Sequence, residues 1–184
     1  MKRAVIGLAL VALSGCGYNR IQTYDEEINA FESQIEVQLQ RRSDLIPNLV
    51  ATVRGFADQE EEVFTSIAEA RSRLGGAIQS GDLGKMAAAN QTLTQGLGRL
   101  LVISEAYPEL RSNQNFMELQ VQLEGTENRI ATARQDYNDA VRTYNGFIRR
   151  FPQVLTAKVT GADAREYFEV TSEAVREVPT VSFD

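Results

Sequence analysis

The sequence predicts an all-α fold, and two observations support this. The first is a single helical phase of apolar residues that continues over residues 112–151, about ten turns. At 1.5 Å per residue this helix would be about 60 Å long, which is too long for one short hairpin to cover its apolar face. The second is that three earlier stretches, residues 18–42, 44–74 and 83–106, carry the same periodicity. We therefore expect the other helices to lie along the long one.

The N-terminus carries the most specific motif of the chain. Met1 is followed by the basic residues Lys2 and Arg3, and residues 4–13 are apolar. Leu-Ser-Gly then precedes Cys16, the only cysteine. About ten apolar residues are too few for a transmembrane helix, which needs about twenty. The motif resembles a bacterial lipoprotein signal with its lipobox. Residues 1–15 would then be a signal peptide, and Cys16 would carry the lipid at the start of a mature domain of residues 16–184. An ordinary signal peptide with an incidental cysteine is the alternative.

The net charge of the chain and the residue after Cys16 indicate where in the cell envelope the protein is expected. The chain has a net charge of −6, and removal of Lys2 and Arg3 with the signal peptide leaves 17 basic against 25 acidic residues, a net charge of −8. Anionic lipid repels such a surface, so we expect the acyl chains to hold the protein on the membrane. Without a basic block, nucleic acid is not an expected partner. Gly17 stands where inner-membrane lipoproteins carry a retention aspartate. We expect the outer side of the cytoplasmic membrane or the periplasmic face of the outer membrane, the latter in a Gram-negative host.

The boundary between the first two helices has two interpretations. Ser43 and Asp44 are favourable N-cap residues, and Pro47 follows where a first helical turn tolerates it. Ser43 could therefore open a new helix after a sharp reversal. Alternatively, the apolar phase continues through Pro47 as one kinked helix. The residues themselves leave both interpretations open.

Glycines and prolines mark the later boundaries. Asp82 is expected to cap the third helix, and Pro108 to end it. Gly96 and Gly98, in the middle of that helix, cost about 1 kcal/mol each relative to alanine, unless they permit a close helix contact. Ser112 is expected to cap the long helix. The glycines that predict a break before the third helix are Gly75, Gly76, Gly81 and Gly84.

The region after the long helix, residues 152–184, is predicted as a tail. Within it, residues 165–175 are consistent with a short helix, and residues 178–183 read as an extended segment with apolar members. These apolar residues are expected to dock on the bundle.

The residue types exclude most catalytic chemistry. The chain has no histidine, which excludes Ser-His-Asp and Cys-His nucleophiles and the Glu-x-x-His motif of di-iron bundles. Lipidation would consume Cys16, the only thiol. No phosphate-binding or dinucleotide-binding glycine motif is present, so we expect no enzyme and no cofactor. The acidic residues 60–62 form a triplet that is better explained as solvated surface than as a cation site.

Several ordered motifs point to a family. They are residues 38–50 (QLQRRSDLIPNLV), 105–110 (EAYPEL), 115–120 (NFMELQ), 126–130 (TENRI), and the Tyr-Asn pairs at 137–138 and 144–145. Together they resemble the LemA family of bacterial envelope proteins, over about residues 18–183. The resemblance implies an antiparallel, up-and-down four-helix bundle outside a membrane, with no established enzymatic activity and with a reversal near residues 42–44. Many members carry a longer N-terminal membrane helix, whereas this chain has a lipobox.

One set of polar residues flanks the predicted core. Arg41 and Arg42 on the first helix could meet Glu127 if the helices run antiparallel. The functional hypothesis is a pocket for a small ligand or a divalent metal ion. The structural hypothesis, which we favour, is a polar network that fixes the helix register. The set comprises Arg41, Arg42, Glu127, Arg134, Asn138 and Asn145.

These observations lead to one expected function and its rivals. We expect a lipid-anchored helical protein of the cell envelope that acts as a scaffold or accessory protein by binding another envelope protein. The alternative is a small-ligand or divalent-metal binding protein that uses interhelical carboxylates. Self-association remains open.

Overall fold

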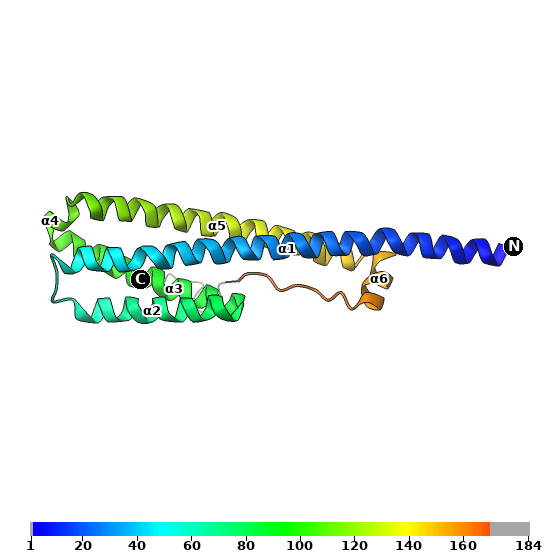
Figure 1. Ribbon diagram of the computed structural model, residues 1–184, viewed down its shortest axis with the longest axis horizontal. Coiled ribbons are helices and arrows are strands. Elements are labelled where there is room, and N and C mark those ends of the chain that lie inside the picture. The colour runs from blue at the N-terminus through cyan, green and yellow to red at the C-terminus, as the bar shows by residue number, and fades with distance from the viewer. Residues whose placement is uncertain (1, 170–184) are drawn as a thin grey trace, which may run out of the picture. The chain divides into compact units, whose positions relative to one another are not determined.

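The computed structural model describes residues 2–169, with side chains from residue 17 onward (Figure 1). Every regular element in this range is an α-helix, so the all-α prediction is confirmed. The helices are α1 (Lys2–Arg54), α2 (Glu61–Ser80), α3 (Leu83–Ala106), α4 (Pro108–Arg111), α5 (Gln114–Ile148) and α6 (Gln153–Thr160).

The described residues group into two compact units. Unit 1 contains residues 2–38 together with Thr126–Tyr167, and unit 2 contains Leu39–Gly125 and residues 168–169. The prediction of one domain over residues 16–184 stays a prediction, and each unit is described by itself.

Unit 1 is built on an antiparallel pair, the first part of α1 and the second part of α5. The ring of Tyr24 meets the ring of Phe147 edge-on, with their centroids 5.3 Å apart, so an early residue of α1 contacts a late residue of α5. Buried side chains follow one another at intervals of seven along both helices, which is the spacing of a coiled-coil seam. They are Ile21, Ile28 and Ile35 on α1, and Ile130, Tyr137 and Tyr144 on α5.

Unit 2 contains the second part of α1, the hairpin of α2 and α3, the single turn α4 and the first part of α5. Helices α2 and α3 pack on each other. Their connection is tight, because Gly81 adopts a left-handed conformation (φ +65°) at the end of α2. The predicted cap of α3 is confirmed, since the Asp82 carboxylate accepts a 2.9 Å hydrogen bond from the Lys85 N–H. Large core side chains of this unit are Leu39, Ile46, Val53, Phe64, Ile67, Leu74, Met86, Leu93, Leu100 and Phe116.

The predicted reversal near residues 42–44 is wrong, because α1 continues through Pro47 to Arg54. The chain turns only at residues 55–60, so the expected helices 18–42 and 44–74 are not the observed ones. Pro47 has no N–H to donate to the carbonyl of Ser43 one turn earlier. Instead, Arg71 Nε of α2 donates a 3.0 Å hydrogen bond to that carbonyl. A neighbouring helix therefore supplies the donor that proline lacks.

Two other predicted boundaries are also wrong. Gly75 and Gly76 lie inside α2, which ends only at Ser80. The cap of α5 is Asn113 and not Ser112, since the Asn113 carboxamide oxygen accepts a 3.1 Å hydrogen bond from the Phe116 N–H. Ser112 instead donates its hydroxyl hydrogen to the carbonyl of Pro108 at 3.0 Å.

The predicted tail begins with a helix that the sequence did not identify. Helix α6 spans Gln153–Thr160, and residues 162–169 have no regular structure. The predicted helix over residues 165–175 is therefore wrong for residues 165–169, and its remainder lies outside the described residues, as does the extended segment 178–183.

The backbone of the predicted signal peptide belongs to α1, which begins at Lys2. In the part of the chain that the structure describes, no helix combines the length and the apolar character needed to cross a membrane.

The two glycines of α3 have different surroundings. A Cβ placed on Gly96 would lie 3.0 Å from Cγ1 of Ile67 on α2, whereas nothing lies within 4 Å of a Cβ on Gly98. Gly96 therefore permits the close contact between α2 and α3, and Gly98 is only a weak point in the helix.

Alanine substitution distinguishes these two roles. Gly98→Ala should raise the free energy of unfolding by up to about 1 kcal/mol, because alanine favours helix and meets no neighbour. Gly96→Ala should be about 1 kcal/mol or more less stable than Gly98→Ala, because its methyl group displaces Ile67. Urea denaturation of both variants measures the difference, and an equal gain in both would contradict the close packing.

A double-mutant cycle tests how Arg71 compensates for Pro47. Arg71→Met should lower the free energy of unfolding by about 1 kcal/mol, because the Ser43 carbonyl loses its donor. In a Pro47→Ala background the loss should be smaller, since residue 47 regains an N–H for that carbonyl. Arg73→Met is the matched control, because Arg73 makes only an exposed ion pair with Glu69 on the same helix. Equal losses for Arg71→Met in both backgrounds would refute the compensation.

Candidate functional site

The segment after α6 is bound to the helices of unit 1 by side-chain hydrogen bonds. We call residues 161–167 the strap. Asn145 of α5 makes two hydrogen bonds with the backbone of Arg165: its Nδ2 donates to the Arg165 carbonyl and its Oδ1 accepts from the Arg165 N–H, both at 2.9 Å. The Tyr137 hydroxyl donates to the carbonyl of Glu166 at 3.0 Å. The strap therefore lies along α5 with its backbone groups satisfied by side chains of that helix.

The side chain of Arg165 connects the strap to α1. Its Nε and Nη2 both donate to Oδ1 of Asp25, at 3.0 and 2.7 Å, and Nη2 also donates to Oδ1 of Asn29 at 3.0 Å. The Arg165 and Asp25 side chains are 37% and 33% exposed. This ion pair is partly shielded from water and should be stronger than a fully exposed pair.

Burial, together with nearby negative charges, raises the pKa values of the tyrosines near the strap. The pKa of Tyr137 is raised to about 12, chiefly by burial and also by the negative charges of Glu32 and Glu166, against the opposing effect of Arg165. Burial also raises the pKa of Tyr144. The pKa of Glu32 is raised by burial and by Glu36. Tyr137 is therefore a hydrogen-bond donor at neutral pH, far from the pKa that a general base would need.

The structure places the predicted polar residues in different environments. Asn145 is buried and binds the strap. Arg42 is buried in unit 2, where its Nη1 donates a 2.7 Å hydrogen bond to Oδ1 of Asn90 on α3. Arg41 is exposed. Sequence reasoning did not identify Asn90 as the partner of Arg42, because a buried asparagine on another helix has no signature along the chain.

The remaining predicted residues lie on α5 or at Cys16. Glu127, Arg134 and Asn138 are half-buried in unit 1, and each has interaction partners. The meeting of Arg41 or Arg42 with Glu127 stays a prediction, since these residues belong to different units. The lipidation of Cys16 also stays a prediction.

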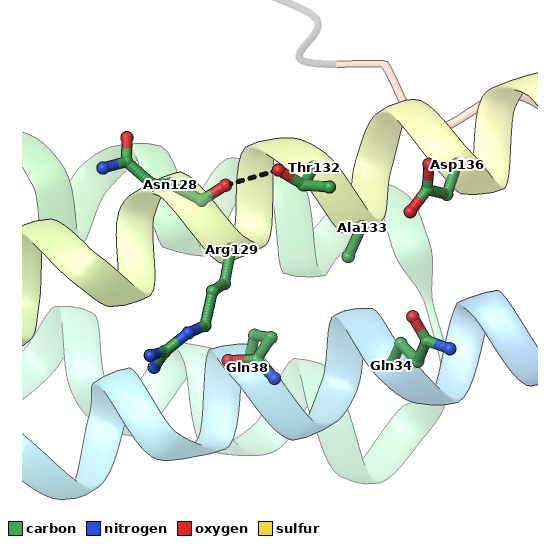
Figure 2. A pocket seen from close by; sticks show the side chains of 7 residues that line it. All are labelled: Gln34, Gln38, Asn128, Arg129, Thr132, Ala133 and Asp136. Carbon is green, nitrogen blue, oxygen red and sulfur yellow. Dashed lines mark hydrogen bonds between the residues drawn. The ribbon is translucent and has the colours of Figure 1, made fainter.

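A polar groove lies between α1 and α5 in unit 1 (Figure 2). It has a volume of about 320 Å³ and opens widely to solvent. Figure 2 shows the Arg129 side chain extending from α5 toward Gln38 of α1. Among the described residues, Oε1 of Gln38 is buried and has no hydrogen-bond partner. The lining residues are Gln34, Gln38, Asn128, Arg129, Thr132, Ala133 and Asp136.

The groove and the strap can bind polar groups, but neither assembles a metal centre. Within the described side chains, no three His, Cys, Asp or Glu residues are close enough together to hold a metal ion. Near the strap, the Asp25 carboxylate is engaged by Arg165. What these residues can do chemically is to donate and accept hydrogen bonds along a helix surface.

The raised pKa of Tyr137 predicts a stability loss at alkaline pH. Below pH 10 the phenol is protonated in both the folded and the unfolded chain. Between pH 10 and about 12 the unfolded chain ionises first, so the folded state loses stability as the pH rises. The free energy of unfolding of the wild type should therefore fall by about 1 kcal/mol between pH 9 and pH 11, relative to that of Tyr137→Phe, which cannot ionise at this position. Urea denaturation at the two pH values measures this, and a constant difference would contradict the buried hydroxyl.

The chain is similar to a known protein family and to several magnetosome proteins. The model of the LemA family matches residues 21–183. Magnetosome proteins MamQ 1 and MamQ 2 of Paramagnetospirillum magneticum are each 31% identical to this chain over 185 residues, which covers 88% of this chain and 68% of each relative. Magnetosome protein MamQ of Magnetospirillum gryphiswaldense is 30% identical over 174 residues, covering 82% of this chain and 64% of the relative. With a family match over nearly its whole length and these relatives, the chain belongs to the LemA family.

Proposed function

We propose that this protein is a lipid-anchored helical bundle of the cell envelope that acts without catalysis, as a scaffold or accessory protein that binds another envelope protein. Its fold would be the antiparallel, up-and-down four-helix bundle that the family resemblance implies. Its location would be the outer side of the cytoplasmic membrane or, in a Gram-negative host, the periplasmic face of the outer membrane. No cofactor and no nucleic acid enter this proposal.

The observation that carries the proposal is the position of Cys16 in the lipobox, within α1 and directly before a buried residue. Gly17, the next residue, is buried within unit 1. A lipid on Cys16 would therefore hold the helices at the bilayer with no linker between them. Several acyl chains, as in a mature lipoprotein, would make this attachment firm.

Exposed apolar side chains in unit 2 support binding to a protein partner. Met117 and Val121 stand four residues apart on α5, so they share one helix face, and they are 46% and 67% exposed. Leu101 and Val102 of α3 are 38% and 67% exposed. Exposed apolar surface of this kind is typical of protein interaction sites.

The similar proteins are magnetosome proteins by name. By analogy, this chain would also belong to a cellular structure and would not diffuse freely. This analogy supports a structural role but does not identify the partner.

The small-ligand alternative would use the polar groove, where Gln38 offers a buried acceptor. Sites for small molecules are usually enclosed, whereas this groove opens widely to solvent. The groove therefore suits a segment of a partner protein better than a small ligand, and we favour the scaffold.

Crosslinking in intact cells tests the proposal. The full chain should be labelled by a fatty acid and should recover the same crosslinked envelope protein in repeated experiments. Met117→Ser combined with Val121→Ser should lower this recovery several-fold, because it removes the exposed apolar pair. Cys16→Ser should lose the label and leave the membrane fraction.

The matched control is Glu118→Ser combined with Gln122→Ser, one residue further along the same helix, where both side chains are exposed. Recovery should be unchanged in this variant. An unlabelled chain would refute the anchor, and the repeated absence of any crosslinked protein would refute the scaffold.

A further inference from the structure

Helix α6 presents an apolar row to solvent at one end of unit 1. Phe151, just before the helix, is 81% exposed, and Leu155 and Val159 are 57% and 88% exposed. The spacing of four residues places Leu155 and Val159 on the same helix face. On the opposite side Ala157 is buried. Leu155 and Val159 thus share an exposed face of α6, and Phe151, which is also exposed, directly precedes the helix.

This row lies beside the start of the mature chain. A Cβ placed on Gly17 would lie 3.3 Å from Oγ1 of Thr156, so the backbone of α1 approaches α6 closely at this point. Cys16 precedes Gly17 in the same helix, about 1.5 Å further along its axis. The proposed site of lipid attachment and the apolar row therefore belong to the same part of unit 1.

The charges at this end differ from those of the whole chain. Residues 149–160 contain three basic residues, Arg149, Arg150 and Lys158, and no acidic residue. All three basic side chains are exposed. The first acidic residue after Cys16 is Asp25. Because salt screens charges beyond about 8 Å, the local charges and not the net charge of −8 expected after removal of residues 1–15 decide how this end meets an anionic surface.

We propose that α6 is a membrane-interface helix: Phe151, Leu155 and Val159 enter the boundary between headgroups and acyl chains, while Arg149, Arg150 and Lys158 meet lipid phosphates. Apolar residues on one face with basic residues beside them are the pattern of helices that lie in this boundary. The proposal rests on the lipid anchor proposed for Cys16, which would bring α6 to the bilayer. The occupant is lipid, since the adjacent anchor would hold the apolar row at the bilayer surface, where anionic headgroups also match the positive charge.

The chain contains no tryptophan, so one introduced tryptophan is an unambiguous fluorescent probe. Leu155→Trp and Val159→Trp place it on the apolar row. Val37→Trp is the matched control, because Val37 is 61% exposed in the same unit but lies about 30 Å along α1 from Cys16. Each lipidated full chain is reconstituted into vesicles of phosphatidylcholine and phosphatidylglycerol, with and without bromine on the acyl chains.

We expect brominated lipid to lower the emission of Trp at positions 155 and 159 about two-fold, because bromine quenches only tryptophan close to the acyl chains. Emission from Trp at position 37 should not change. If the protein is bound to the vesicles but positions 155 and 159 are quenched no more than position 37, the interface helix is refuted and the lipid anchor stands.

Two other outcomes also refute the proposal. A blue-shifted emission at position 155 without quenching would show that protein, either a second copy or a partner, covers the row. A fatty-acid label missing from Cys16, together with failure of the chain to bind vesicles, would overturn both the anchor and the interface helix.

Discussion

The fold depends on an apolar repeat that continues along α1. Ile21, Ile28 and Ile35 stand seven apart in unit 1, and Leu39, Ile46 and Val53 stand seven apart in unit 2, all of them buried. A helix break at Pro47 would have exposed part of this repeat to water, which costs more than one missing backbone hydrogen bond. The helix therefore continues through the proline, and the hydrogen bond from Arg71 to the Ser43 carbonyl reduces the remaining cost.

Two polar side chains, those of Arg42 and Asn145, are buried with hydrogen-bond partners on another element. Arg42 occupies the position that continues the row of Ile21, Ile28 and Ile35 by another seven residues, and it is buried against Asn90. Asn145 is likewise buried, with both ends of its carboxamide bonded to the backbone of Arg165. Each of these groups is costly to bury without its partner, so each favours one alignment of the surrounding segments over its alternatives. The structure thus supplies partners for two members of the predicted polar set, and the network that would join all six stays a prediction.

The sequence predicted the elements that depend on local signals. The third helix was predicted at its observed bounds, because Asp82 is a strong cap and Pro108 a strong terminator. The long helix was predicted to within three residues at each end. By contrast, the reversal at residues 55–60 was missed, because the residues left both interpretations of Pro47 open and the family resemblance implied a reversal near residues 42–44. Nothing near Pro47 in sequence indicates that Arg71 would supply its missing donor.

The candidate site was harder to predict than the helices. Asn145 was identified from its place beside the apolar repeat, but its partner lies on the strap, which has no periodicity. Asp25 and Arg165 are 140 residues apart, and neither is distinguished from the many charged residues that face solvent. Contacts of this kind follow from the path of the chain after α6, and that path depends on tertiary packing and not on any repeat.

The close approach of α1 to α6 at Gly17 also restricts how the chain can vary. An α-helix turns about 100° per residue. A single residue inserted between Gly17 and Ile21 would therefore rotate Gly17 by that angle and move it away from Thr156. The segment before Ile21 is thus constrained in its length as well as in the size of its side chains.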